Sequence, residues 1–257
     1  DARIAQQIAK LKREGNEAQI PARIYGDMTP TAQRPVFNLR CLQEIWDRRV
    51  LAKVQPRQFE VSFSAADYQA GKPPVLSHVP LHGRLTVFRA PQPEFTYIVS
   101  GDASRGTEKD DYAVAQVLCR ETFEQVARWR GHIEPAQFAD VMAGLGVYYN
   151  HALLAPEVIK EGYTVMHRLL NEYGYPFLYR GVKNARGDAV FEGTMGFVPN
   201  SATKRMVIDD LAMVISEMSV WLHDIDTYNE LRTFERSEGG VIARLGAVNG
   251  MHDDCVT

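Results

Sequence analysis

The chain has 257 residues, of which 45% are hydrophobic, and a formal net charge of −3 at pH 7. This length is enough for one or two domains with a buried core, and no apolar run is long enough to cross a membrane. The slightly acidic balance counts against a surface basic enough to hold nucleic acid by itself. The three cysteines, Cys41, Cys119 and Cys255, lie far apart in no metal-ligand spacing, which is typical of buried thiols in a reducing compartment.

The N-terminal third predicts a mostly helical or irregular segment. Residues 1–18 and 38–50 carry apolar side chains at helical spacing and predict two helices. Residues 55–93 are rich in proline and glycine and hold no long periodic stretch, so they predict an irregular linker or an arm packed on its neighbour. We therefore expect an N-terminal segment and linker over 1–90 and a separate domain over 91–257.

From residue 94 onward, the predicted elements follow one another closely. Three consecutive strands are predicted over 95–100, 112–120 and 124–131. Helices and strands then alternate: a helix over 135–150, a strand over 151–158, a helix over 163–173 and a strand over 177–182. These are followed by a helix over 201–218 with Ser201 as N-cap, a short helix over 227–234 and a hairpin over 234–246. Such a meander followed by alternating elements predicts an α/β fold with a mixed sheet flanked by helices. The order resembles that of the ribonuclease H-like fold.

Four acidic residues fall where predicted strands or helices end or begin. Asp102 ends an apolar strand, where an isolated aspartate is also a common turn residue. Glu157 ends another apolar stretch, where an unpaired buried carboxylate would be costly. Asp253 and Asp254 follow a histidine, and capping of a final helix explains one acid more easily than two. We expect these acids to converge on one pocket.

A pocket of this kind predicts divalent metal chemistry. Clustered carboxylates repel one another and take up protons unless a cation lies between them. Oxygen ligands favour Mg²⁺ or Mn²⁺ over zinc. Two such ions about 3.5–4 Å apart can activate a water and stabilise the leaving oxygen in phosphodiester cleavage. The sequence thus predicts that Asp102, Glu157, Asp253 and Asp254 are metal ligands and catalytic residues.

Three motifs together resemble the nuclease domain of viral (bacteriophage) large terminase subunits. The first is 97–106 followed by 111–117, in which an aspartate ends a strand, a glycine turn follows, and an Asp-Tyr pair begins the next strand. The second is 157–169, in which an acid follows a hydrophobic strand and precedes a glycine and a helix; Ile-Lys-Glu at 159–161 stands where that family usually has asparagines. The third is 250–256, a His-Asp-Asp run after a hairpin. The resemblance covers the chain from about residue 94.

This resemblance implies a Mg²⁺- or Mn²⁺-dependent endonuclease that cuts double-stranded viral DNA by two-metal hydrolysis during genome packaging, in the host cell cytoplasm. It implies metal ligation by Asp102, Glu157 and Asp253, with Asp254 as a second ligand or an orienting neighbour. Asp111 would have a supporting role.

The resemblance also implies partners. These are double-stranded DNA, an upstream ATPase motor domain, a small terminase subunit and a portal protein, with no membrane involved. Residues 1–90 lack the Gly-x-x-x-x-Gly-Lys-Ser/Thr phosphate loop of such a motor, so they would form its tail and the linker.

Other polar and aromatic residues carry weaker predictions. Six basic residues in turns or at helix starts are either phosphate contacts or ordinary solvated charges: Arg105, Lys109, Lys183, Arg186, Lys204 and Arg205. Residues 184–188 predict a loop that could guide a DNA strand. Three histidines (His132, His151, His167) and three tryptophans (Trp46, Trp129, Trp221) are predicted to be structural, whereas His252 could be structural or a ligand.

Three other functions remain open from the sequence. Residues 102–107 faintly resemble the first phosphate loop of sugar-kinase and actin-like ATPases, but no second Asp-x-Gly-rich loop follows. A related nuclease, such as a junction resolvase or transposase, would use the same acids. A non-catalytic docking module for a portal or small terminase subunit would carry them as remnants.

Overall fold

The computed structural model describes residues 34–52, 54–107, 111–181, 195–237, 244–247 and 253–256. The predicted helix over 1–18 and the predicted loop over 184–188 lie outside these residues. Within the described parts of the chain, no helix is both long and apolar enough to cross a membrane.

A seven-stranded mixed sheet forms the centre of the molecule, in the order β2-β1-β3-β6-β5-β4-β7. Its strands are β1 (Arg57–Ser62), β2 (Val75–His78), β3 (Leu85–Val87), β4 (Tyr97–Asp102), β5 (Ala113–Cys119), β6 (Glu124–Gly131) and β7 (Leu153–Pro156). All neighbouring strands are antiparallel except β4 and β7, which run parallel. The predicted mixed sheet flanked by helices is therefore confirmed.

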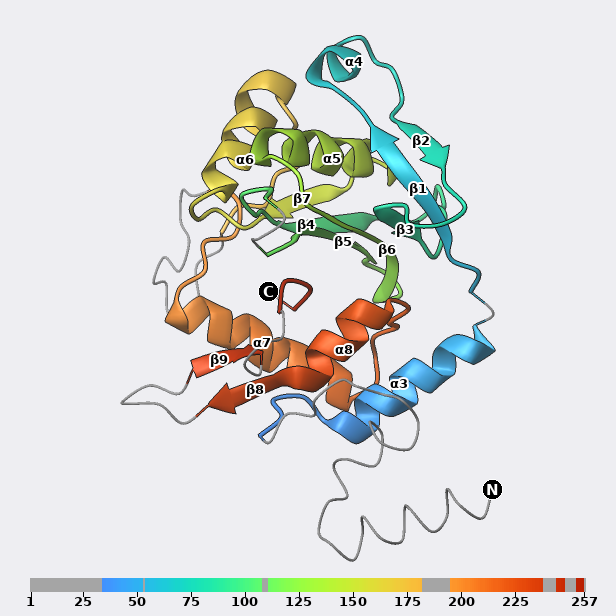
Figure 1. Ribbon diagram of the computed structural model, residues 1–257, viewed down its shortest axis with the longest axis vertical. Helices are drawn as coiled ribbons and strands as arrows, with labels where there is room; N and C mark the ends of the chain where they lie inside the picture. The colour runs from blue at the N-terminus through green and yellow to red at the C-terminus, as the bar shows by residue number, and fades with distance from the viewer. Residues whose placement is uncertain are drawn as a thin grey trace, which may run out of the picture.

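Helices cover both faces of this sheet (Figure 1). On one face lie α5 (Pro135–Tyr148), α6 (Gly162–Arg168) and the π-helical turn η2 (Leu169–Tyr173) that continues it, with α4 (Ala65–Gln69) beside β1. On the other face lie α3 (Leu39–Leu51), α7 (Ser201–Ser216), α8 (Ile225–Thr233) and the hairpin of β8 (Phe234–Ser237) and β9 (Arg244–Ala247). The sheet thus separates two helical layers.

Each layer has its own buried cluster. Under α5, the side chains of Phe138 and Met142 are fully buried against the sheet. A Cβ at Gly101 would lie 2.6 Å from the Met142 sulfur, so glycine lets α5 approach β4 closely, next to Asp102. In the other layer, Trp46 of α3 stacks on Tyr228 of α8 at a centroid distance of 4.6 Å. Both helical layers are therefore anchored by packed side chains.

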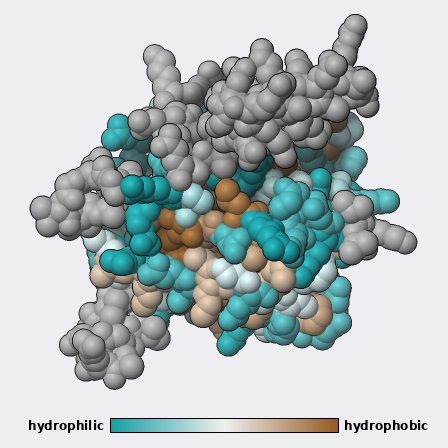
Figure 2. Space-filling view, turned by 90° about the horizontal axis from the view of Figure 1, so that it is seen from below, coloured by the Kyte–Doolittle hydropathy of each residue, from teal (hydrophilic) through white to brown (hydrophobic). Residues whose placement is uncertain are grey.

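The surface of the second layer is partly apolar. Helix α7 exposes Met206, Val207 and Met213. Seen from below, an apolar area lies in the middle of the described surface and is bordered by hydrophilic residues (Figure 2).

The prediction of an irregular linker over 55–93 is wrong. Residues 57–87 supply β1, β2 and β3, and Leu85 of β3 pairs with Trp129 of β6. Strand β1 does alternate, with Phe59 and Val61 between polar residues, but the proline- and glycine-rich composition of the segment obscured this signal, and β2 and β3 have only four and three residues. Part of the segment 1–90 consequently belongs to the same sheet as the rest of the chain.

Three smaller predictions also differ from the structure. Within the predicted strand over 177–182, the described residues 177–181 form isolated bridges rather than a full strand, Leu178 with Leu154 and Arg180 with Met195. The N-cap of α7 is Asn200 rather than Ser201, because the Asn200 side chain accepts hydrogen bonds from the Ala202 and Thr203 amides at 2.9 and 3.0 Å. Residues 253–256 form a turn where a helix start was predicted.

Candidate functional site

The parallel pairing of β4 and β7 brings Asp102 and Glu157 together. Gly101 and Pro156 are partners in the two strands, and the Glu157 amide donates a 2.8 Å hydrogen bond to the Gly101 carbonyl. The two acids therefore leave the same edge of the sheet side by side, and their side chains share a hydrogen bond. Parallel strand ends in such layered folds are where ligand-binding groups gather.

The chain turns sharply after Glu157. Lys160 has a φ of +44°, in the left-handed region that non-glycine residues rarely adopt. The Gly162 amide then donates to the Ile159 carbonyl at 2.8 Å, and α6 begins. A Cβ at residue 162 would overlap the Glu157 carbonyl oxygen, so only glycine allows this close return over the acid. The turn keeps Glu157 at the sheet edge.

The third stretch, 253–256, reaches the same edge from the other layer. The Tyr112 amide, just before β5, donates to Asp254 Oδ2 at 3.3 Å. Asp253 Oδ2 lies 3.9 Å from Lys204 Nζ, near the start of α7. Three stretches that are distant in the sequence thus bring four acids to one place.

All four acids line one cavity of about 470 Å³. Its charged lining also includes Asp111 and the basic residues Arg105, Lys160 and Lys204. Arg105 Nε is 3.1 Å from Glu161 Oε1, which also lines the cavity. Apolar walls are supplied by Phe197, Pro199, Val207 and Ile208, among others. The predicted convergence of Asp102, Glu157, Asp253 and Asp254 on one pocket is therefore found.

The electrostatics of this cavity disfavour so many negative charges. Burial, together with the nearby charges of Glu157, Asp254 and Asp253, raises the pKa of Asp102 to about 8. Burial also raises the pKa of Glu157, although its hydrogen bond with Asp102 and the charge of Lys204 act in the opposite direction. Without a cation, this pair therefore retains a proton near neutral pH.

The donor set fits a hard divalent cation, since the cavity brings carboxylate oxygens together and their repulsion would be relieved by positive charge. Asp102, Glu157, Asp253 and Asp254 could supply these oxygens. However, among the described residues no three His, Cys, Asp or Glu side chains are grouped closely enough to hold one ion between them. The carboxylates share a cavity without forming a ready-made cage.

Of the described basic residues that the sequence pointed to, only some lie at the cavity. Lys204 and Arg105 line the cavity, whereas Arg205 is exposed beside Asp209, at 3.7 Å. Lys109, Lys183, Arg186 and His252 lie outside the described residues.

The tryptophans and histidines that were predicted to be structural differ in how deeply they are buried. Trp46 and Trp129 are buried, as expected for core residues, and Trp221 is half-buried. His132 packs on Tyr112 with a centroid distance of 4.2 Å. His151 and His167 are exposed and are not among the residues that line the cavity.

Sequence reasoning missed two features of the site. Lys160 lines the cavity three residues after Glu157, and its closeness to that acid was the available signal. Glu230 holds the Cys255 amide next to Asp254, at 2.7 Å. No local pattern indicates this contact, because the two residues lie 25 positions apart.

No family model and no curated protein matches the chain. Solved structures do match its fold. One is the large terminase nuclease of thermophilic phage G20c with bound magnesium, which is 18% identical in sequence and gives a TM-score of 0.58. The match covers 88% of this chain and 94% of the phage chain. The same phage nuclease with bound cobalt gives a TM-score of 0.57 over the same shares, also at 18% identity. The large terminase nuclease domain of Thermus phage P74-26 matches at 19% identity and a TM-score of 0.51, over 68% of this chain and 81% of that chain. The chain thus has the ribonuclease H-like fold of phage large-terminase nuclease domains, as the motifs predicted.

Proposed function

We propose that the chain is a metal-dependent endonuclease that cuts double-stranded DNA during viral genome packaging in the host cell cytoplasm. The observation that carries the proposal is that four carboxylates from three distant stretches line one cavity at the sheet edge. The fold shared with phage terminase nucleases, one of which was crystallised with bound magnesium, supports this reading. An ATPase role would leave Glu157, Asp253 and Asp254 unexplained, and a docking module would carry the acids only as remnants.

Asp102, Glu157 and Asp253 would hold the metal, with Asp254 as a second ligand or an orienting neighbour. Mg²⁺ or Mn²⁺ suits this oxygen donor set, and the phage G20c nuclease was crystallised with magnesium and with cobalt. When bound, a pair of such ions would lower the pKa of a water and stabilise the leaving oxygen of a phosphodiester. Asp111, also in the cavity, would support the ligands.

The chain's own cations would position the DNA. Arg105, Lys160 and Lys204 lie around the acids and can contact phosphate oxygens on either side of the cut. Such contacts carry no sequence information, so cleavage by this chain alone would be weak and poorly selective. Selectivity would come from an upstream ATPase motor domain, a small terminase subunit and a portal protein.

The test is cleavage of supercoiled plasmid by the purified chain in Mn²⁺. We expect nicked and linear products, their loss with EDTA, and their loss in Asp102→Ala. Asp140→Asn is the matched control, because Asp140 is a partly buried acid whose partners are Arg168 and Tyr173, away from the cavity. Cleavage by Asp102→Ala at the wild-type rate would refute the site, and an inert wild-type chain that still binds a portal would favour a docking module.

A further inference from the structure

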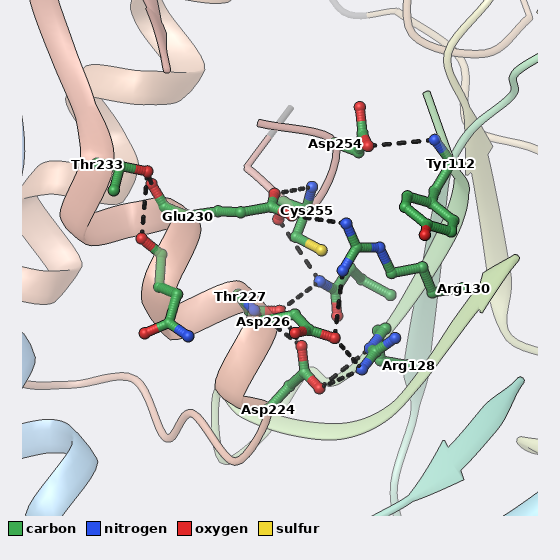
Figure 3. A network of polar contacts seen from close by, with 12 residues as sticks. Tyr112, Arg128, Arg130, Asp224, Asp226, Thr227, Glu230, Thr233, Asp254 and Cys255 are labelled. Atoms are coloured by element: carbon green, nitrogen blue, oxygen red, sulfur yellow. Dashed lines mark hydrogen bonds and ion pairs between the residues drawn. The ribbon is translucent and has the colours of Figure 1, made fainter. Parts of the chain in front are cut away.

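The turn that carries Asp253 and Asp254 is held by a side chain from α8. Glu230 Oε2 accepts the backbone N–H of Cys255 at 2.7 Å, and both residues are buried. Figure 3 shows the Glu230 side chain reaching from its helix to this turn. The hydrogen bond fixes the amide that directly follows Asp254.

Arg130 of β6 contacts the two residues that hold the turn, Glu230 and Tyr112. Its Nη2 lies 3.4 Å from Glu230 Oε1, and its guanidinium lies 4.1 Å from the centre of the Tyr112 ring. Tyr112 in turn donates its backbone N–H to the Asp254 side chain (Figure 3). One arginine therefore contacts the residue that holds the Asp254 carboxylate and the residue that holds the Cys255 amide.

Helix α8 is itself fixed to the sheet, so Glu230 has a defined place. Arg128 of β6 donates to Asp224 at 2.7 and 3.0 Å and to Asp226 at 2.7 Å (Figure 3). Arg130 Nη1 lies 3.3 Å from the same Asp226. The position of the turn relative to Asp102 is thus set through β6 and α8.

Fold stability alone is a poor explanation for this arrangement. Among the described residues, the buried Arg130 Nε has no hydrogen-bond partner, and the buried Glu230 Oε1 has only its 3.4 Å ion pair with Arg130 and no hydrogen bond. Buried charges that are incompletely bonded weaken a fold, and an apolar pair of similar size would often be more stable. Residues retained at such a cost are commonly tied to a functional site.

We propose that Glu230 and Arg130 are positioning residues that hold the Asp253–Asp254 turn against the cavity, so that its carboxylates face Asp102 and Glu157. The inference rests on the proposed function, because it concerns the placement of the proposed metal ligands. Outer partners of this kind commonly change metal affinity by about 10- to 100-fold when they are removed.

The experiment compares the full chain with Glu230→Ala, Glu230→Gln and Asp140→Asn. Mn²⁺ affinity is measured by calorimetry, and backbone amide exchange is followed by mass spectrometry on the C-terminal peptide. Glu230→Gln keeps an acceptor for the Cys255 amide and nearly the same shape, so it guards against failure of the alanine variant to fold. Asp140→Asn reports the effect of losing a partly buried acid elsewhere.

We expect Glu230→Ala to bind Mn²⁺ about 10-fold or more weakly and to exchange faster in the C-terminal peptide. Glu230→Gln should lose less affinity, and Asp140→Asn should match the wild type in both readouts. Mn²⁺ affinity or amide exchange unchanged in Glu230→Ala would overturn the inference. A wild-type chain that binds no Mn²⁺ would instead contradict the proposed function, and the exchange result would still decide whether Glu230 holds the turn.

Discussion

The backbone N–H of Glu157 donates a 2.8 Å hydrogen bond to the carbonyl of Gly101, the residue before Asp102. This bond lies at the end of the β4–β7 ladder and places two carboxylates side by side where both strands leave the sheet. Their shared hydrogen bond and raised pKa values follow from that placement. The properties of the cavity can therefore be tested through these two acids.

The first prediction concerns pH and metal. In the metal-free chain, Asp102 and Glu157 have pKa values raised by folding, so the folded state binds protons more tightly than the unfolded state. Their contribution to the free energy of unfolding is then most favourable near pH 4 and falls as the pH rises towards about 8. Thermal denaturation in EDTA at several pH values measures this fall.

Mg²⁺ should raise the melting temperature more at pH 8 than at pH 5, because the deprotonated acids bind the cation and the protonated acids do not. A metal effect that is equal at both pH values would contradict this prediction.

The second prediction is that Asp102→Asn makes the metal-free chain more stable. At pH 9, where Asp102 is deprotonated, the change removes one of the repelling buried charges while keeping the size of the side chain. We expect a gain on the order of 1 kcal/mol in the free energy of unfolding, measured by urea denaturation in EDTA. The same variant should lose the stabilisation by Mn²⁺. A variant less stable than the wild type in EDTA would show that the negative charge of Asp102 is well solvated.

The third prediction concerns the glycine that follows the Glu157 turn. In Gly162→Ala the new Cβ would meet the Glu157 carbonyl oxygen, so the turn must shift. We expect a loss of about 1–3 kcal/mol in stability together with a loss of plasmid cleavage and Mn²⁺ affinity.

Gly174→Ala is the control for this change. Gly174 has a φ of +60° but open space around its Cβ position, so alanine adds backbone strain without a clash near the acids. It should cost stability and leave Mn²⁺ affinity unchanged. Equal Mn²⁺ affinity in Gly162→Ala and the wild type would argue against the turn as the element that positions Glu157.

The two strands beside Asp102 were predictable because their apolar residues stand out. The β-rich run of β4 and the mostly apolar run of β5, interrupted by Gln116, appear directly in the sequence, and Asp102 ends the first of them. Glu157 was predicted from the end of an apolar stretch, and the Asp253–Asp254 pair from its place after a histidine at a predicted helix start; all four acids line the same cavity. Their roles as ligands and catalytic residues stay a prediction.

Features set by distant contacts were not predictable from local pattern. Strand β3 has three residues, and it becomes a strand by pairing with β6, in which its partner residues lie 40 to 44 positions later in the chain. The contact of Glu230 with the Cys255 amide likewise depends on the packing of α8 on β6. Local propensity decides neither feature, because tertiary partners supply the free energy.

The cavity lies at a seam between the sheet and the layer of α7 and α8. Asp102 and Glu157 come from the sheet, whereas Lys204, Val207 and Ile208 come from α7. The width of the site therefore depends on how tightly the two layers close, and a sliding of α7 by a fraction of an ångström would change every spacing across it. Packing among the side chains beneath α7 therefore controls how far apart the two walls of the cavity lie.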